Sequence, residues 1–361
     1  MRDLRAHQKH DKNEKGTFEN ASCYVLISET LSGFNFKKRA GNMLTSVELC
    51  AGAGGQALGI EKAGFSHTAL VEIDKHCCNT LRHNRPEWNV LEEDMRVFKE
   101  RAADYKGMDL LAGGLPCPPF SVAGKQLGEL DERNLFDDAI DLVDAARPRA
   151  VMIENVRGFL DAVFHDYRER LKTQLDKLGY KTDWRLLNAS DYGVPQLRPR
   201  VVIVAVLKER SECYEWPEAS PHNPRTVGET LRDLMAARGW RGADDWAARA
   251  DEIAPTIVGG SKKHGGPDLG PTRARAAWAT LGVEGRTIAP EAPDAFFDGM
   301  PRLTVPMVAR IQGFPDDWHF TGAKTNAYRQ VGNAFPPPVA QAVSSQIAKA
   351  LRKRLLRAVS A

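Results

Sequence analysis

The sequence predicts an α/β protein in which helices cover both faces of an open, mostly parallel sheet, with a second, smaller domain attached. Short apolar runs alternate with segments of helical period between Ser46 and Leu207, which is the pattern of successive βα units. A glycine-rich turn separates the first strand from the first helix, as in sheets that bind a cofactor at their carboxyl edge. After Leu207 the alternation stops, which indicates a second domain.

The alternation assigns the elements in order. Apolar runs predict strands at residues 46–49, 68–73, 108–112, 151–154, 181–187 and 200–207. Helical periods predict helices at residues 56–63, 75–83, 134–146 and 167–178. A last helix is expected within residues 333–356, where Val339, Val343, Ile347 and Leu351 form one apolar stripe. Because such a stripe needs a covering surface, we expect this helix to return to the first domain.

Composition divides the chain into four parts. Residues 1 to about 20 are polar and mixed in charge, which predicts that the N-terminal extension 1–43 is flexible, with Met43 as an alternative start. Residues 44–207 form the predicted sheet domain. Residues 208–300 are richer in Pro, Gly, Trp and charge and show no settled period, so they are the predicted smaller domain. Residues 301–361 are expected to bridge the two domains and to end in the returning helix.

The composition excludes several classes of protein. The formal charge of the 361-residue chain is only +3, so a polyanion would have to be bound by local clusters of Lys and Arg. No apolar run is long enough to span a membrane, and the first twenty residues lack the apolar core of a signal peptide, which predicts a cytoplasmic protein. The six cysteines have neither zinc-ligand spacing nor the pattern of a disulfide framework, so no metal site is expected.

The glycine turn is the first candidate site. It comprises residues 50–57, with Gly52, Gly54 and Gly55, and Glu72 ends the following strand. Glycines allow a cofactor to approach the backbone, and a carboxylate at the end of the second strand can accept hydrogen bonds from ribose hydroxyls. On its own the turn fits a nicotinamide dinucleotide, another adenosine cofactor or a plain tight turn.

Cys117 is the second candidate, because three prolines surround it directly after a predicted strand. Proline fixes its own backbone and restricts the residue before it, so the thiol is aimed by the chain, as a nucleophile requires. The alternative for a lone cysteine is a small buried apolar side chain.

Two further polar groups follow in order. Glu154 ends the next predicted strand, so it and Cys117 are expected at the same carboxyl edge of the sheet. Arg198 and Arg200, with Gln196, precede a later strand, and their alternate spacing predicts that both guanidinium groups lie on one side. Taken singly, Glu154 could cap a helix or form a salt bridge, and the arginines could be ordinary surface residues.

In combination these motifs resemble the DNA (cytosine-5-)-methyltransferase family of the bacterial restriction-modification type. The resemblance covers most of residues 44–345. It rests on Gly-Leu-Pro-Cys-Pro-Pro-Phe-Ser at 114–121, Glu-Asn-Val at 154–156, Gln-x-Arg-x-Arg at 196–200, Arg-Ile-Gln-Gly-Phe-Pro at 310–315 and Gln-Val-Gly-Asn-Ala at 330–334. It implies a seven-stranded class I methyltransferase (Rossmann-like) sheet, a smaller target-recognition domain and double-stranded DNA bound between them by a monomer.

The resemblance also implies catalytic roles. Cys117 would bond to carbon 6 of a cytosine that has been flipped out of the duplex, which activates carbon 5 for methylation. Glu154, protonated through a raised pKa, would bind the Watson–Crick edge of the base, and Arg200 its carbonyl oxygen. Arg198 and Gln196 would support the site. A restriction endonuclease would be the genetic partner, and methylation would protect the host DNA.

The implied cofactor is S-adenosyl-L-methionine. The residues implied to bind it are Cys50, Gly52, Gly54, Gly55, Glu72, Asp94, Pro116, Leu135 and Asn333. The sequence also departs from the family pattern in the cofactor turn and between the predicted domains. Cys50 stands where an aromatic residue is usual, and Pro306-Met307 replaces a usual Arg-Glu pair, so charge contacts between the domains are expected to be lost there.

Candidate DNA contacts come from the loop after Cys117 and from a glycine-rich basic stretch at 259–275. They are Ser121, Gln126, Lys262, Lys263, Arg273 and Arg275. A plain basic loop is an equal alternative for 259–275. The competing functions are an RNA (tRNA) cytosine methyltransferase and a DNA-binding protein without turnover, and the sequence does not give the recognition site.

Overall fold

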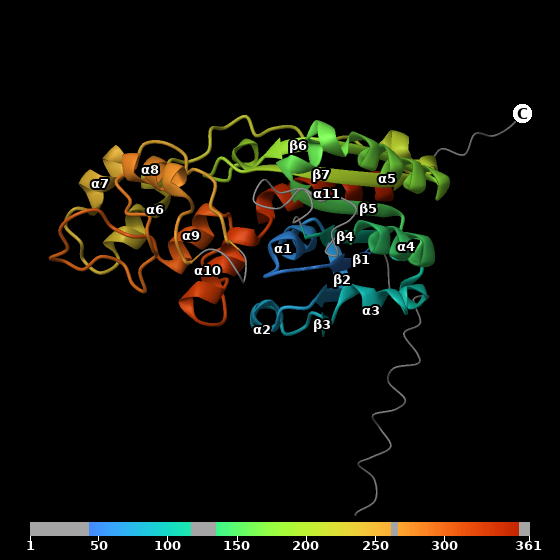
Figure 1. The fold of residues 1–361 in the computed structure, drawn as a ribbon, viewed down its shortest axis with the longest axis horizontal. Helices are drawn as coiled ribbons and strands as arrows, with labels where there is room; N and C mark the ends of the chain where they lie inside the picture. Colours follow the sequence, from blue (N-terminus) through green and yellow to red (C-terminus); the bar gives the residue numbers. More distant parts are fainter. Residues whose placement is uncertain (1–42, 117–134, 261–265, 354–361) are drawn as a thin grey trace, which may run out of the picture. The chain divides into compact units, whose positions relative to one another are not determined.

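A computed structural model describes residues 43–116, 135–260 and 266–353, and the predicted extension 1–43 lies, except for Met43, outside these residues. Its centre is a seven-stranded sheet in the order β3-β2-β1-β4-β5-β7-β6 (Figure 1), so the predicted class I methyltransferase sheet is confirmed. The strands are β1 (Leu44–Leu49), β2 (Phe65–Glu72), β3 (Val90–Glu92), β4 (Leu110–Gly114), β5 (Ala150–Val156), β6 (Tyr180–Asn188) and β7 (Pro199–Leu207).

The strand directions match an open, mostly parallel sheet. Strands β1 to β5 pair in parallel, whereas β7 is antiparallel to both of its neighbours, β5 and β6. Strand β3 was not predicted, because its three residues are at most half-buried and form no apolar run. The predicted end of β5 at Glu154 was wrong: the strand continues to Val156, so Glu154 lies within a paired strand.

Two layers of helices cover the sheet. Helices α1 (Gly55–Lys62) and α11 (Pro337–Arg352) bury one face, with Ile60, Val339 and Val343 against Ala112, Met152 and Val204. The other face packs against α3 (Met95–Lys99), α4 (Phe136–Ala146) and α5 (His165–Lys177). Helix α2 (Lys75–Asn84) follows β2. No helix within the described ranges combines the length and apolar character needed to cross a membrane.

Residues 208–300 contain α6 (Val227–Ala236), α7 (Ala243–Arg249) and α8 (Thr272–Thr280), and no strand among those that the structure describes. The expectation that this part has no settled period was wrong for α6. Its buried side chains Val227, Leu231 and Met235 recur every fourth residue, and Thr226 and Glu229 form a capping box at its start. Gly228 and the charged residues between them hid the pattern.

One apolar cluster joins this part to the rest of the chain. It contains Leu231 of α6 and Trp246 of α7 together with Leu58 of α1, Val308 of α9 (Val305–Ile311) and Val331 of α10 (Lys324–Asn333). Residues 301–335 therefore pack against both sides, as expected of a bridging segment. The domain boundaries at 207 and 300 stay predictions.

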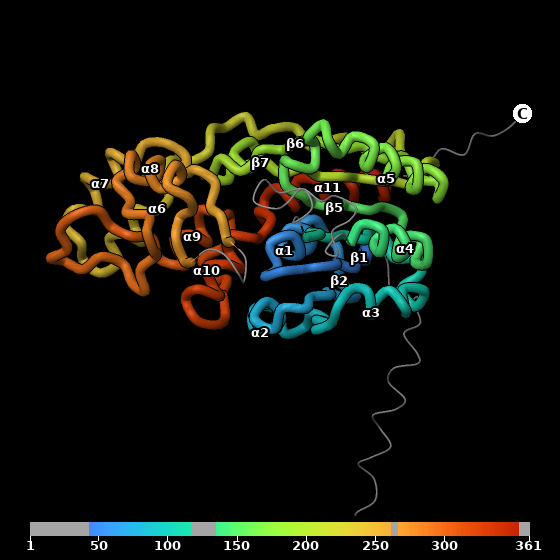
Figure 2. Tube along the Cα trace, viewed as in Figure 1, coloured from blue at the N-terminus to red at the C-terminus, as the bar shows by residue number. Residues whose placement is uncertain are grey.

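The last helix expected within residues 333–356 is α11, and a separate helix precedes it. Helix α10 ends at Asn333, and α11 begins at Pro337, which takes the first helical position where a missing N–H costs nothing. The tube trace shows α11 running beside α1, at the opposite end of the sequence (Figure 2). Their contact is close, since a Cβ atom at Gly59 would lie 2.5 Å from that of Ala340.

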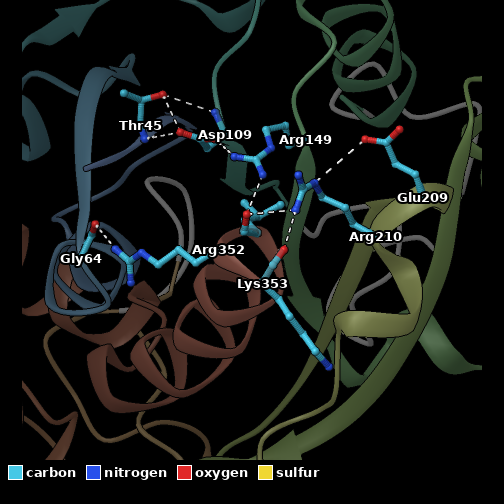
Figure 3. A network of polar contacts seen from close by, with 9 residues as sticks. Thr45, Gly64, Asp109, Arg149, Glu209, Arg210, Arg352 and Lys353 are labelled. Atoms are coloured by element: carbon cyan, nitrogen blue, oxygen red, sulfur yellow. Dashed lines mark hydrogen bonds and ion pairs between the residues drawn. The ribbon is translucent and has the colours of Figure 1, made fainter. Parts of the chain in front are cut away.

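Guanidinium groups hold the end of α11 (Figure 3). Arg149 donates to Leu351 O at 2.6 Å and pairs with Asp109 at 2.6 Å, while Arg210 donates to Leu351 O at 3.1 Å. The last carbonyl groups of a helix have no partner within it, so these contacts satisfy them and tie α11 to the sheet. The expected return of the final helix is thus achieved by packing along its length and by charge at its end.

A histidine beneath α1 predicts a pH dependence of stability. Its ring nitrogens lie 3.0 Å from Ser46 Oγ and 3.0 Å from Ala57 O, and burial lowers the pKa of His67 from 6.5 to about 4. Below pH 6.5 the unfolded chain binds a proton that the folded chain refuses until about pH 4. The free energy of unfolding should therefore decrease as pH falls through this window, by about 3 kcal/mol at most.

Urea unfolding of the wild type, His67→Gln and His165→Gln across the window checks this dependence. The His67 variant should lose it, whereas the variant of His165, whose side chain is 67% exposed, should keep it. An unchanged slope in the His67 variant would contradict the assignment.

Candidate active site

The carboxyl ends of β1, β4 and β5 meet at two glycines. Leu49 pairs with Gly113, and Gly114 pairs with Glu154. A Cβ atom at Gly114 would lie 3.6 Å from Glu154 Oε2 and 3.8 Å from Cys50 O. The glycine turn and Glu154 are therefore neighbours at one edge of the sheet, as the sequence predicts.

Three residues of the turn have left-handed backbone: Cys50 with φ 52°, Gly52 with φ 55° and Gly54 with φ 89°. Gly54 and Gly55 are needed for packing. A Cβ atom at Gly54 would lie 2.7 Å from Leu81, and one at Gly55 would lie 2.2 Å from Phe335 O. Gly52 differs, because nothing lies within 4 Å of the position its Cβ would occupy. The turn is thus closed by protein behind Gly54 and Gly55 and open at Gly52.

Glu72 lies across this opening. Its Oε2 accepts from Gly52 N at 2.7 Å and its Oε1 from Asp74 N at 2.7 Å. Burial raises the pKa of Glu72, and these backbone donors partly oppose the rise. Each carboxylate oxygen has two lone pairs, so each can accept a further hydrogen bond from a ligand hydroxyl.

Asp94 lies at the start of α3, and Cys50 is the first residue of the glycine turn. Asp94 caps α3 and binds the Arg96 guanidinium at 2.6 Å, and this hydrogen bond is the main reason that the pKa of Asp94 is lowered. The thiol of Cys50 lies 3.8 Å from Met95 Sδ. The sulfur atoms of Cys50 and Met95 therefore lie in contact at the position where the family pattern has an aromatic ring.

The remaining predicted cofactor residues lie at the ends of other elements. Pro116 follows β4, and Leu135 precedes α4, each partly buried. Asn333 ends α10, and its amide donates to Gly260 O at 3.2 Å, so in this structure it contacts the 208–300 part.

Glu154 and Arg200 form a buried ion pair. The Nε–Oε1 distance is 2.8 Å, with side chains 15% exposed for Arg200 and 10% for Glu154. Burial raises the pKa of Glu154, and the positive charges of Arg200 and Arg198 oppose this rise. The raised pKa agrees with the expectation for a carboxyl group that keeps a proton.

Arg198 and Gln196 are fully buried, so the surface interpretation of Arg198 was wrong. The Arg198 guanidinium donates to Ile257 O at 2.6 Å, Gly332 O at 2.8 Å and Ala334 O at 3.1 Å. Arg200 instead turns to Glu154. The two guanidinium groups therefore have different partners: Arg198 binds three backbone carbonyl groups, and Arg200 pairs with the buried carboxylate.

Several predicted residues lie outside the described residues: Cys117, Ser121, Gln126, Lys262 and Lys263. Of the two candidate DNA contacts on α8, Arg273 is exposed and Arg275 donates to Thr272 Oγ1 at 3.3 Å.

Three residues that support the site or join it to residues 208–300 were not predicted. Trp318 donates to Ala53 O at 3.2 Å and covers the glycine turn, although no motif marks it. Gln312 is fully buried and binds Gln196 at 2.7 Å; its position within the motif at 310–315 was the available sign. Arg310 binds Asp233 of α6 at 2.5 Å, so a charge contact joins α9 to the 208–300 part despite the departure at Pro306-Met307.

Comparison with known proteins decides the family. The sequence profile described as "C-5 cytosine-specific DNA methylase" matches residues 44–349. The chain belongs to this family. It is 54% identical over 316 residues to the type II methyltransferase M.NgoMIV of Neisseria gonorrhoeae, covering 86% of this chain and 98% of that protein. It is 55% identical over 312 residues to M.NaeI of Lentzea aerocolonigenes, covering 85% and 75%.

Solved structures agree on the fold. A prophage-encoded protein of Escherichia coli superposes with a TM-score of 0.60 at 22% identity, covering 86% of this chain and 100% of that one. The methyltransferase EhMeth of Entamoeba histolytica superposes with a TM-score of 0.60 at 14% identity, covering 87% and 100%.

The chain is therefore a type II DNA cytosine-5 methyltransferase of a restriction-modification system, its substrate is DNA, and its methyl donor is S-adenosyl-L-methionine. The residues present fit that cofactor. Gly52 leaves space that a Cβ would fill, Glu72 accepts from its N–H, and Asp94 offers a further carboxylate acceptor at the start of α3.

Two alanine variants separate binding of the cofactor from packing. Gly52→Ala puts a methyl group into open space at the cost of about 1 kcal/mol of backbone strain, so it should fold and bind the cofactor at least about tenfold more weakly. Gly54→Ala meets Leu81 and Trp318 and should lose about 1–3 kcal/mol of stability to overpacking. Calorimetric titration and urea unfolding measure the two effects. Unaltered cofactor affinity in Gly52→Ala would refute the assignment of the space at Gly52 to the cofactor.

Proposed function

We propose that this enzyme methylates carbon 5 of a cytosine turned out of double-stranded DNA, and that Cys117 is its nucleophile. The observation that carries the proposal is the buried Glu154–Arg200 pair beside Gly114. Cys117 follows Gly114 by three residues in sequence, and Pro116 between them restricts the backbone. The pair thus lies at the end of the strand that leads to the cysteine.

The reaction needs a nucleophile because carbon 5 of cytosine is unreactive while the ring is conjugated. When the Cys117 thiolate adds to carbon 6, the 5,6 double bond is broken and its electrons form a double bond between carbons 4 and 5. The ring is then an enamine, and its carbon 5 has the electron density to attack an electrophilic methyl group. Bound S-adenosyl-L-methionine supplies that methyl group. Loss of the proton at carbon 5 then expels the sulfur and restores the double bond.

Glu154 and Arg200 stabilise the negative charge that develops on the ring. A protonated Glu154 donates to ring nitrogen 3, and its other oxygen accepts from the exocyclic amine. Arg200 binds the carbonyl oxygen at carbon 2, and its positive charge favours the thiolate form of Cys117. The ion pair at 2.8 Å keeps both groups oriented before the base arrives.

The cofactor is held by the chain's own residues around Gly52. Glu72 would accept hydrogen bonds from the ribose hydroxyls, and Asp94, which binds Arg96 in this structure, would accept one from the adenine amine. Gly54 and Gly55 keep the turn closed behind the methionine part, with Cys50, Pro116, Leu135 and Asn333 as further walls.

The target base must leave the duplex, because carbon 6 is inaccessible within stacked base pairs, and extrusion costs a few kcal/mol. We assign contacts with DNA to Ser121, Gln126, Lys262, Lys263, Arg273 and Arg275. The enzyme acts as a monomer on the bacterial chromosome in the cytoplasm, and a restriction endonuclease of matching specificity is its genetic partner.

Bisulfite sequencing of DNA from cells that express the chain tests the proposal and reports the recognition sequence. Protected cytosines should occur at one sequence context. A methyl-transfer assay with duplex DNA and with transfer RNA provides the control, and label entering only RNA would contradict the assigned substrate.

Replacement of the nucleophile separates binding from chemistry. Cys117→Ser should abolish methyl transfer, because a hydroxyl of normal pKa does not add to carbon 6, while affinity for the DNA site is kept. Filter binding and methyl transfer measure the two properties. Activity equal to that of the wild type would remove Cys117 from the mechanism.

Glu154→Gln keeps hydrogen bonding but cannot pass a proton to nitrogen 3. We expect kcat to fall by about 10²–10⁴. In the wild type the protonated carboxyl is the active form, so the rate should decrease as pH rises through the raised pKa of Glu154, and this limb should vanish in the variant. Glu212→Gln, at an 86% exposed side chain, is the control. If the rate of Glu154→Gln still decreased as pH rises, Glu154 would not be the proton donor to nitrogen 3.

A further inference from the structure

We propose that Gln312 is a positioning residue that couples the target-recognition part of the chain to the Glu154–Arg200 pair. The inference rests on the proposed function and deepens it, because it names the contact through which DNA recognition reaches the catalytic groups. It is carried by a chain of oriented amides, formed by Ala334 O, Gln312, Gln196 and Ile257 N, which we call the amide chain.

The amide chain has one direction. Gln312 Nε2 donates to Ala334 O at 2.5 Å, Gln196 Nε2 donates to Gln312 Oε1 at 2.7 Å, and Ile257 N donates to Gln196 Oε1 at 2.9 Å. The side chains of Gln312 and Gln196 are fully buried. Because each amide has a donor end and an acceptor end, the orientation of Gln312 fixes that of Gln196, which in turn receives Ile257.

Both polar groups of Ile257 are therefore held by one short stretch of chain. Gln196 accepts from Ile257 N, and Arg198 donates to Ile257 O at 2.6 Å. Two further hydrogen bonds join the same stretches: Leu197 N donates to Ala254 O at 2.8 Å, and the Thr256 hydroxyl donates to Leu197 O. Residues 254–257 thus lie directly along residues 195–198.

The other side of the segment 254–260 packs against the end of α10. A Cβ atom at Gly332 would lie 2.4 Å from Gly259 Cα, and one at Gly259 would lie 2.5 Å from Asn333 Oδ1. Two glycines make this close crossing possible. The segment 254–260 is consequently held between the Gln196–Arg198 stretch and the end of α10, directly before Lys262 and Lys263 in the sequence.

The same stretch leads into the catalytic pair. Arg200 is two residues beyond Arg198 and binds Glu154 at 2.8 Å. A shift of residues 254–257 therefore acts on residues 196–198 and moves the start of β7, where Arg200 lies. Misplacement of a catalytic group by about 1 Å can cost about 10²-fold in rate, so this connection can make the rate depend on the sequence bound.

The decisive variant is Gln312→Met, which keeps the volume and removes both amide contacts. Gln330→Met is the matched control, since Gln330 is another buried glutamine of the bridging segment. It accepts from Thr80 at 2.6 Å and donates to Thr321 O at 2.8 Å, so neither of these hydrogen bonds goes to the 254–260 segment. Both variants lose two hydrogen bonds and should lose similar stability.

The measured quantity is discrimination, defined as kcat/KM on the recognised site divided by kcat/KM on a site with one base pair changed. Gln312→Met should lower discrimination about tenfold, mainly through kcat on the recognised site, with KM for the cofactor unchanged. Gln330→Met should retain it. Discrimination kept in Gln312→Met, or lost equally in both variants, would overturn the proposal.

A double variant tests whether Gln312 acts through Gln196. Gln196→Met together with Gln312→Met should cost no more discrimination than Gln196→Met alone, whereas additive losses would contradict the amide chain.

Hydrogen exchange separates this inference from the proposed function. The peptides containing residues 196–202 and 254–258 should exchange faster in Gln312→Met and not in Gln330→Met, whether or not DNA is methylated. If the wild type fails to methylate duplex DNA, the proposed function fails. If the wild type is active and exchange is unchanged in Gln312→Met, the positioning role fails.

Discussion

The active site depends on one electrostatic constraint, the burial of a carboxylate and a guanidinium beside each other at the carboxyl edge of the sheet. Glu154 and Arg200 come from neighbouring antiparallel strands, β5 and β7, and their contact at 2.8 Å is almost shielded from water. Removing one partner would leave a buried charge without compensation, which is strongly destabilising. The reversed direction of β7 brings Arg200, near its start, to the carboxyl edge where β4 and β5 end.

Close packing around glycines brings the other groups to this edge. Gly113 and Gly114 end β4 beside Leu49, Cys50 and Glu154, while Gly54 and Gly55 let Trp318 and Phe335 approach the cofactor turn. Trp318 and Phe335, which are far from the glycine turn in the sequence, thus pack directly against it. The end of α11, held by Arg149 and Arg210, keeps that helix against α1 and so supports the turn from behind.

Much of this arrangement could be predicted from sequence because it is encoded locally. The apolar runs gave the strands of the central sheet, and the positions of Glu72 and Glu154 after apolar residues placed them at the carboxyl edge. The motifs at 114–121 and 196–200 indicated the family. What could not be predicted depends on partners distant in sequence. Arg198 reads as a surface residue until Ile257, Gly332 and Ala334 are seen to surround it, and Trp318 has no local mark of its contact with Ala53. Strand β3 and helix α6 were missed because short length and interrupted periods give weak patterns.

The central claim is that sulfur bonds to the pyrimidine ring during turnover. Duplex DNA with 5-fluorocytosine at the target position tests it most directly, because fluorine at carbon 5 leaves no proton to lose and the adduct cannot be released. After incubation with S-adenosyl-L-methionine, mass spectrometry of the wild type should show DNA attached to the peptide that contains Cys117. Absence of that adduct from an enzyme that methylates ordinary cytosine at the same site would contradict the account.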